Sequence, residues 1–190
     1  MPVVLASRSP QRRALLARLA PRFEVVESRV DESACGAGEP EALALDLARA
    51  KAEDVAARRP EALVVAADTL VECLGEVIGK PADRDDAVRI LTLLSHNPHR
   101  VITGLCVAAP DGRRAEAVSV THLRMKPMSR AEIARYVRRE AVLERAGAYD
   151  IQEYDARIIS LQGSRSSVIG LPLEDLRRIL LSLYPGDAAT

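Results

Sequence analysis

The chain has no tryptophan and one phenylalanine, and aromatic residues make up only 3% of its 190 residues. Its 27 lysines and arginines equal its 27 aspartates and glutamates, so no overall positive charge attracts a nucleic-acid backbone or an anionic membrane. Binding of single strands also relies on aromatic side chains that stack on bases. The low aromatic content and the neutral net charge argue against a polynucleotide-binding module and a membrane partner. Any polyanion would have to be bound by a local group of charged or polar residues.

Long apolar runs and paired cysteines are also missing. No stretch approaches the ~20 apolar residues that cross a bilayer, and the first residues lack the cationic and apolar regions of a signal peptide. Cys35, Cys73 and Cys106 are odd in number, far apart and flanked by apolar residues, which favours buried thiols over disulfides or a thiolate metal site. From these features we expect a cytoplasmic protein.

The residues that are present predict one α/β domain over residues 1–190. Hydrophobic residues make up 48% of the chain, which is enough for one sizeable core. Periodicity and turn residues predict strands at 3–6, 23–26, 63–67, 77–78, 101–109, 117–126 and 157–161, and helices after Ser9 and at 41–58, 83–94, 129–140 and 173–183. Residues 163–167 are predicted to form a polar turn.

The turn after the first expected strand has the features of an anion site. Ser9 can cap a helix and Pro10 suits its first turn, so free backbone amides point outward there. Arg12 and Arg13 follow, although cations in a first turn oppose the helix dipole. Guanidinium groups match phosphate oxygens, so the segment predicts a phosphate site. Two solvated surface arginines explain the local sequence equally well.

A carboxylate interrupts the apolar run of residues 63–67. Asp68 and Thr69 follow this run before apolar residues resume. An aspartate near the edge of a sheet can hold a divalent cation and can take a proton from an attacking water. The alternative is a strand-end aspartate that accepts hydrogen bonds from neighbouring amides.

Two lysines, a glutamine and a glutamate are weaker candidates. Lys51 lies in a small, apolar stretch of the long helix, and Lys80 lies between a glycine and a proline. Both ammonium groups could be aimed at a site, although lysines are usually exposed. Gln152 could contact a base edge or cap a local turn. Glu32 belongs to an acidic pair that fits a solvent-facing loop equally well.

Together these segments resemble the Maf family of nucleotide pyrophosphatases. The matching motifs are residues 7–13 (SRSPQRR), 31–32 (DE), 50–52 (AKA), 67–69 (ADT), 79–81 (GKP), 103–104 (TG), 147–152 (GAYDIQ) and 170–172 (GLP). Each motif alone is a poor pattern. The ordered set spans nearly the whole chain, and that order makes the resemblance specific.

The resemblance implies a mixed, curved β-sheet flanked by helices, with two lobes around a deep nucleotide cleft, as in inosine-triphosphatase-like enzymes. It implies hydrolysis of a nucleoside triphosphate between the α- and β-phosphates, with Mg²⁺ or Mn²⁺ as cofactor, and a homodimer. Asp68 would activate water and would bind the metal together with Glu32. The implied substrate-binding residues are Ser7, Ser9, Arg12, Arg13, Lys51, Lys80 and Gln152.

The motif around Gln152 resembles the branch of the family that acts on dTTP and UTP, whereas a branch acting on 7-methyl-GTP tends to have an acidic residue there. Asp150 and Glu153 depart from the family, which often has a small residue and a glycine at these places, so they add negative charge near the expected base pocket. A non-catalytic nucleotide-sensing regulator of septum formation and cell division is the main alternative. The chain retains every charged group that hydrolysis requires, which argues against it.

Overall fold

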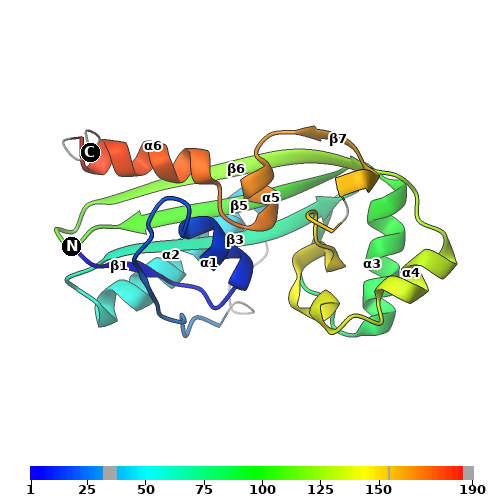
Figure 1. Cartoon of the computed structure of the whole chain (residues 1–190), viewed down its shortest axis with the longest axis horizontal. Coiled ribbons are helices and arrows are strands. Elements are labelled where there is room, and N and C mark those ends of the chain that lie inside the picture. Colours follow the sequence, from blue (N-terminus) through cyan, green and yellow to red (C-terminus); the bar gives the residue numbers. More distant parts are fainter. Residues whose placement is uncertain (32–37, 154, 186–190) are drawn as a thin grey trace.

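A computed structural model of the chain describes residues 1–31, 38–153 and 155–185, apart from the side chains of residues 140 and 141 (Figure 1). Its strands are β1 (Val3–Leu5), β2 (Glu24–Val25), β3 (Leu63–Cys73), β4 (Glu76–Ile78), β5 (His99–Ala108), β6 (Arg114–Met125) and β7 (Ile158–Gln162). Its α-helices are α1 (Pro10–Leu16), α2 (Pro40–Arg58), α3 (Arg84–His96), α4 (Arg130–Tyr136), α5 (Arg165–Ile169) and α6 (Leu173–Leu183). Short 3-10 turns are η2 (Glu140–Glu144), η3 (Ala146–Ala148) and η4 (Asp155–Arg157).

Within the described residues the strands form one open, mixed sheet of seven strands. The order is β2-β1-β3-β5-β6-β7, and β4 also pairs with β3. β2, β1 and β3 are parallel, whereas β4, β5, β6 and β7 join by antiparallel pairing. Helices flank this sheet, so the expected mixed α/β architecture is confirmed.

One edge of β3 is open at its centre. β5 pairs with β3 over residues 64–72, so β1 and β4 must share the opposite edge. On that edge β1 pairs with residues 63–65 and β4 pairs with residues 71–73. Among the described residues no strand covers residues 66–70 there, and we call this stretch the open edge of β3. Side chains on both faces of the strand can therefore reach the same space.

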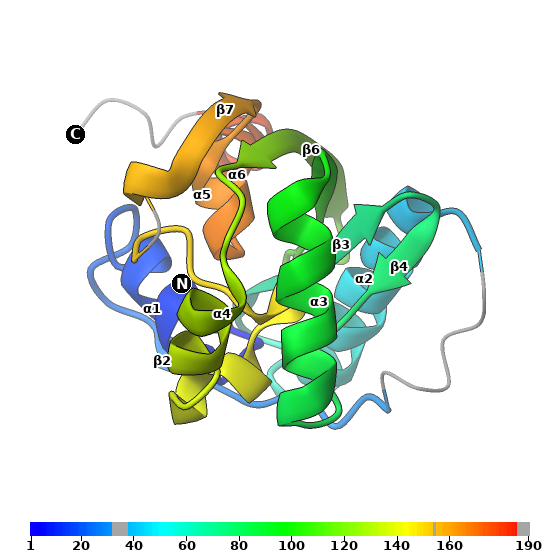
Figure 2. The same ribbon diagram turned by 90° about the vertical axis from the view of Figure 1, so that its right-hand side faces the viewer.

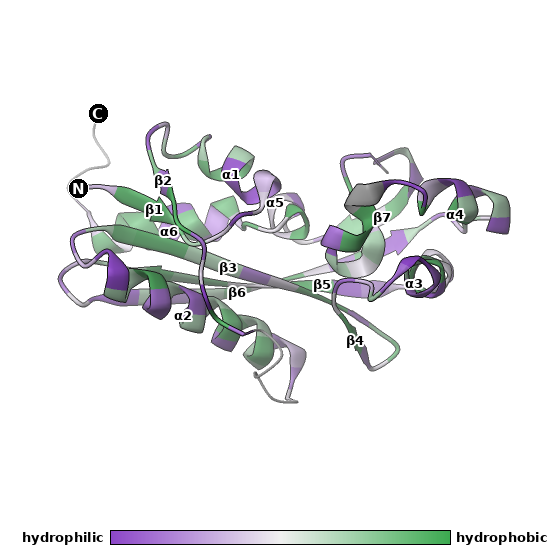
Figure 3. Ribbon diagram, turned by 90° about the horizontal axis from the view of Figure 1, so that it is seen from below, coloured by the Kyte–Doolittle hydropathy of each residue, from purple (hydrophilic) through white to green (hydrophobic). Residues whose placement is uncertain are grey.

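The side chains of β3 alternate between two layers of helices, as a pleated strand requires. Val64 and Ala66 pack against α2, whereas Val65 and Ala67 belong to the core that contains residues of α1 and α6. Figure 3 shows α2 on one side of the sheet and α1 and α5 on the other. By this alternation Asp68 continues the α2 face, and Thr69 continues the opposite face.

A separate hydrophobic core lies at the far end of the sheet. It contains the apolar sides of α3 and α4, including Ile90, Leu94 and Ile133, and the buried Tyr149. Figure 1 shows α3 and α4 together at this end, away from α1 and α6, and Figure 2 looks at the molecule from this end, with α3 and α4 side by side. The open edge of β3 lies between this core and the cores formed around α1, α2 and α6, which gives the molecule two lobes.

Gly104 allows α2 to approach the sheet closely. It is the register partner of Asp68 on β5. A Cβ atom at this position would lie 2.2 Å from the backbone oxygen of Ala44, which is closer than real atoms come. Lys51 follows Ala44 by two helical turns, so it lies on the same face of α2. Because Gly104 has no side chain, α2 can lie close enough to the sheet to place Lys51 over the centre of β3.

Three local predictions need correction. Asp68 and Thr69 do not interrupt a strand, because β3 runs through them to Cys73. Residues 163–167 are not only a turn, since Ser164 caps α5 by accepting a hydrogen bond from the amide of Ser167. The helix expected over 129–140 ends at Tyr136, although it begins as expected, with a capping box between Ser129 and Glu132.

The described cysteines behave as core residues. Cys73 and Cys106 are buried and free, as expected, and burial raises the pKa of the Cys106 thiol to about 12. Cys35 lies outside the described residues. Over the part of the chain that the structure describes, no helix combines the length and apolar character needed to span a membrane.

Candidate active site

A buried ion pair lies at the open edge of β3. The Lys51 Nζ donates to Asp68 Oδ1 at 2.5 Å, and the two residues are only 7% and 6% exposed. Lysine and aspartate are almost never this buried unless they are paired. The pair therefore keeps a carboxylate and an ammonium together in a largely desolvated position.

The second oxygen of Asp68, Oδ2, is not fully buried. No described group donates to Oδ2, yet no buried side-chain oxygen or nitrogen of the described residues lacks a hydrogen-bond partner. Oδ2 must therefore be accessible, and the space beside it is a cavity of about 560 Å³ that Asp68, Thr69 and Leu70 help to line. One oxygen of the carboxylate is thus held by Lys51, and the other is available to a ligand or water.

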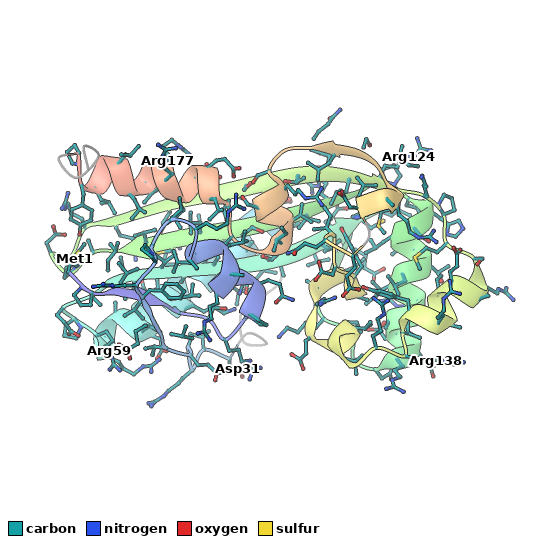
Figure 4. The ribbon with its side chains drawn as sticks, in the orientation of Figure 1. Met1, Asp31, Arg59, Arg124, Arg138 and Arg177 are labelled. Atoms are coloured by element: carbon teal, nitrogen blue, oxygen red, sulfur yellow. The ribbon has the colours of Figure 1, made fainter. Side chains whose placement is uncertain are left out.

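The cavity continues into a second hollow of about 680 Å³. Ser9, Gln11, Lys80, Glu144 and Arg145 line both spaces, so the two are parts of one cleft. Asp68 and Tyr149 belong to the first part, whereas Ser7, Lys51 and Asp31 line the second. Figure 4 shows Asp31 on the loop after β2, below α1. The total space is large enough for a small organic ligand.

Arg12 is held rigidly at the wall of this cleft. Its Nε donates to the carbonyl oxygen of Gly170 at 2.8 Å, and its Nη2 donates to Thr69 Oγ1 at 3.2 Å. Its Nη1 donates more weakly to Ser7 Oγ at 3.4 Å. The helix α1 starts at this point because Ser9 accepts a hydrogen bond from the Arg12 amide, as its sequence predicted. A guanidinium anchored at three places loses little entropy when it binds a planar set of oxygens.

The direction of the hydrogen bonds behind Arg12 can be deduced. The Thr103 hydroxyl donates to the carbonyl oxygen of Ser167 at 2.9 Å, and this uses its single proton. Thr69 Oγ1, which lies 3.0 Å from Thr103 Oγ1, must therefore donate to it. The remaining lone pairs of Thr69 then accept from Arg12. Each member of this chain orients the next, from the Ser167 backbone to the guanidinium.

We expect Thr103→Val to lower the free energy of unfolding by about 1–2 kcal/mol, because the Thr69 hydroxyl loses its acceptor and the buried Ser167 carbonyl loses one of its two donors, the other being the Gly170 amide. Urea unfolding would measure this loss. Thr103→Ser keeps the hydroxyl and should recover most of the stability. Equal stability of the valine and wild-type proteins would show that the hydrogen-bond chain contributes nothing.

The structure brings most of the predicted residues to the cleft. Ser7, Ser9, Arg12, Lys51, Asp68 and Lys80 all line one or both of its parts. Ser7 is buried and accepts from the Ser9 amide at 3.2 Å, which folds the loop before α1 tightly. Lys80 is exposed at the rim, two residues after the end of β4.

Three predicted residues are not placed in the cleft. Arg13 is exposed and lines a shallow hollow with Pro10 and Phe23, because successive helical positions point in different directions and only Arg12 faces the sheet. Gln152 is exposed and is absent from the cleft lining, although its neighbour Ile151 belongs to it. Glu32 lies outside the described residues.

The sequence did not single out Thr69, Thr103 or Arg145 as functional residues. Thr69 and Thr103 belong to motifs of the family resemblance, but no role was assigned to either of them. In the structure Thr69 lies on the face of β3 that packs against α1, which explains its contact with Arg12. Arg145 lines both parts of the cleft and lies 3.0 Å from Asp150. Its position just before the GAYDIQ motif was the available signal.

Asp150 and Glu153 do not simply add negative charge near the cleft. Arg145 forms ion pairs with both, and Arg139 also pairs with Glu153. The two carboxylates that depart from the usual residues are thus matched by two nearby arginines. The expected excess of negative charge is largely offset within this part of the chain.

The described residues also offer ligands for a hard cation. Asp68 and Asp31 bring carboxylate oxygens to adjoining parts of the cleft, and Mg²⁺ is commonly held by one or two carboxylates plus substrate phosphates. Among the described residues no cluster of three or more His, Cys, Asp or Glu side chains could form a complete metal site. The donor set fits a cation that arrives with an anionic ligand.

A cleft that combines anchored cations with an accessible carboxylate is the arrangement of an enzyme that acts on a polyphosphate. Comparison with known proteins agrees with this class. The family model described as Maf-like protein matches residues 2–183, and the chain therefore belongs to the Maf-like family.

Curated relatives share most of their length with this chain, and several have the same name. A dTTP/UTP pyrophosphatase of Geobacter sulfurreducens is 44% identical over 184 residues, covering 93% of this chain and 96% of the relative. A dTTP/UTP pyrophosphatase of Lacticaseibacillus casei is 37% identical, covering 95% and 98%. A third, from Aquifex aeolicus, is 40% identical, covering 96% of each chain.

Among solved structures, a nucleoside-triphosphatase / dITP/XTP pyrophosphatase from Mycobacterium abscessus covers 97% of this chain and 98% of its own. The identity is 17% and the TM-score is 0.46. This likeness is too distant to bear on the site.

Proposed function

We propose that this protein is a dTTP/UTP pyrophosphatase that hydrolyses its substrate to the nucleoside monophosphate and pyrophosphate. The observation that carries the proposal is the buried Lys51–Asp68 pair, which opens onto a cleft with Arg12 and Lys80 on its walls. The shared name of the relatives supports the choice of substrate. The cytoplasmic location and the homodimer stay predictions from the sequence.

Asp68 is proposed as the general base. Its Oδ2 would take a proton from water as the water oxygen bonds to the α-phosphorus and the bond from that phosphorus to the αβ-bridging oxygen breaks. The leaving pyrophosphate keeps the bridging oxygen and its electron pair. Lys51 holds Oδ1 and so fixes the orientation of the carboxylate.

The cations of the cleft are proposed to offset the charge of the triphosphate, which otherwise repels an approaching nucleophile. Arg12 is already aimed by Thr69 and Gly170, so it needs little reorganisation to bind phosphate oxygens. Lys80 would contact the phosphates from the opposite rim. Ser7 and Ser9 belong to the same phosphate-binding loop, whereas Arg13 would act only through its long-range charge.

Mg²⁺ or Mn²⁺ is proposed as cofactor, bound by Asp68 and Glu32. When bound, the ion would polarise the phosphoryl oxygens and neutralise part of their charge. Asp68 fits both roles, general base and metal ligand, because Oδ2 is open to the cleft, and a carboxylate oxygen has two lone pairs, one for the ion and one for the proton of water. Gln152 is proposed to contact the base, which would require a side-chain movement toward the cleft.

A pyrophosphate-release screen tests this proposal. Purified protein would be assayed with dTTP, UTP, CTP, dATP and 7-methyl-GTP, each with Mg²⁺, with Mn²⁺ and with excess EDTA. We expect pyrophosphate release from dTTP and UTP to be at least about tenfold faster than from the other nucleotides, because one or two contacts to the base can discriminate by about this factor. Release should stop when EDTA removes the metal ion.

The screen also separates the alternatives. Faster pyrophosphate release from 7-methyl-GTP than from dTTP or UTP would place the protein in the branch of the family that acts on 7-methyl-GTP. Tight nucleotide binding without any pyrophosphate release would reject an enzyme and favour the non-catalytic regulator.

A further inference from the structure

Arg145 occupies a central position in the cleft. It is one of the residues that line both parts, and its side chain is only 18% exposed. The amide of Gly147 donates to the carbonyl oxygen of Gly79 at 3.1 Å, which ties this segment to the chain just before Lys80. Lys80 also lines both parts of the cleft. Two cations from different segments therefore share one wall.

The chain turns back on itself so that Arg145 meets Asp150. Gly147 and Ala148 both have left-handed backbone conformations, with φ of 73° and 62°. Such a conformation is costly for alanine, and it is kept only where the surroundings require it. Arg145 Nη2 then lies 3.0 Å from Asp150 Oδ2, and its Nη1 lies 3.7 Å from Glu153 Oε1.

Asp150 is itself fixed in place. Its Oδ1 accepts a hydrogen bond from the Gln152 amide at 2.8 Å, and its own amide donates to the Tyr136 hydroxyl at 3.2 Å. Its side chain is only 12% exposed. The carboxylate therefore cannot follow the guanidinium if the guanidinium moves. Arg145, by contrast, has a long stem and five donors, and two acidic partners use only part of them.

The geometry points to Arg145 as a further triphosphate-binding residue, restrained by the Asp150 carboxylate in the free protein. On binding, phosphate oxygens compete with Asp150 for the guanidinium, so Asp150 sets how tightly the cleft holds a polyphosphate. This inference rests on the proposed function, because it takes the triphosphate as the ligand. It assigns to Asp150 a role in tuning affinity.

The guanidinium of Arg145 can pair either with the carboxylate of Asp150 or with a phosphate, so one can replace the other. Guanidinium groups bind carboxylates and phosphates with the same planar fork. Asp150 neutralises part of the charge of Arg145, which weakens its attraction for another anion. Glu144 lines the same two parts of the cleft, yet it makes no ion pair among the described residues. Glu144 therefore offers a matched control for the loss of one negative charge.

The test is a double-variant cycle on the full-length protein. KM and kcat for dTTP would be measured for R145M, D150N and R145M/D150N, and also for E144Q with and without R145M. We expect R145M to raise KM about tenfold, as for loss of one charge-assisted contact, and D150N to lower KM at least about threefold. In the R145M background D150N should change KM less than about twofold, because its partner is gone.

The controls distinguish restraint from simpler effects. E144Q should lower KM by the same factor in the wild-type protein and in R145M, because the loss of this negative charge acts only through the electrostatic potential of the cleft. An equal decrease for D150N in both backgrounds would overturn the restraint of Arg145 by Asp150. If R145M and D150N both raised KM and lowered the melting temperature, the pair would be purely structural, and the inference would fail.

The inference and the proposed function fail in different ways. Binding of a dTTP analogue with a non-hydrolysable α,β-linkage would be measured by calorimetry for the same variants. A wild-type protein that binds the analogue but releases no pyrophosphate from dTTP or UTP contradicts the proposed function alone. Active wild-type protein whose variants show no coupling between residues 145 and 150, in either KM or analogue affinity, contradicts the inference alone.

Discussion

Asp68→Asn is expected to reduce the rate of pyrophosphate release by at least about 10³-fold, because a positioned general base alone contributes about 10²–10⁴ and the same carboxylate is the proposed metal ligand. Asparagine keeps the shape of the side chain but cannot accept a proton from water. The measurement is kcat for dTTP with saturating Mg²⁺. Binding of a non-hydrolysable analogue should persist within about tenfold, since the other cations of the cleft remain.

The same substitution should also change stability. The Lys51 ammonium is buried and loses the carboxylate that lies 2.5 Å from its Nζ. We expect a loss on the order of 2 kcal/mol in the free energy of unfolding, typical of a removed partner of a buried charge. Lys51→Met combined with Asp68→Asn should recover part of the stability without any recovery of activity. An Asp68→Asn protein that keeps a tenth of the wild-type kcat would exclude Asp68 as the base.

Gly104→Ala is expected to produce the largest loss of stability among single substitutions to alanine at the described glycines. The added Cβ would lie 2.2 Å from the Ala44 backbone oxygen and 2.6 Å from the Leu45 amide nitrogen. Backbone atoms cannot rotate away, so α2 must shift from the sheet. Overpacking costs about 1–3 kcal/mol when side chains can adjust, and here we expect at least about 3 kcal/mol because they cannot.

Urea unfolding of Gly104→Ala and Gly38→Ala would check this expectation. A Cβ atom added to Gly38 would have no described atom within 4 Å, and the φ of Gly38 is not positive, so its substitution should change stability by less than about 0.5 kcal/mol. Gly104→Ala should also lower kcat in the folded fraction, because α2 carries Lys51 to Asp68. Wild-type stability in Gly104→Ala would show that the helix can move without cost.

Local patterns predicted much of the fold. Asp-Gly is typical of hairpin turns, and Asp111–Gly112 joins β5 and β6, while the final helix has the predicted bounds of 173–183. Each of these signals depends on residues close together in the chain, such as a hairpin turn, a cap or a helical period. The mixed character of the sheet was expected from the resemblance to a family, whereas the order of the strands was not predicted, because strand neighbours that are far apart in sequence leave little trace in local pattern.

The candidate site was predicted in part for the same reason. Ser9 capped its helix as expected, since a cap is a local feature. The pairing of Lys51 with Asp68 depends on the contact between α2 and β5 at Gly104, which no local pattern reveals. Arg13 was grouped with Arg12 because both are arginines, yet adjacent helical positions face different surroundings. Arg145 was missed because its role follows from a backbone reversal at Gly147 and Ala148.

The open edge of β3 allows the adjacent residues Asp68 and Thr69 to contribute to the same cleft. They are adjacent in sequence but point to opposite faces, and only the missing strand beside residues 66–70, among the described residues, lets both serve one cleft. A single inserted or deleted residue upstream in β3 would exchange their faces, since the pleat has a period of two. The carboxylate would then point toward Arg12 and the hydroxyl toward Lys51. We therefore expect substitutions along this strand to be tolerated far more often than insertions or deletions.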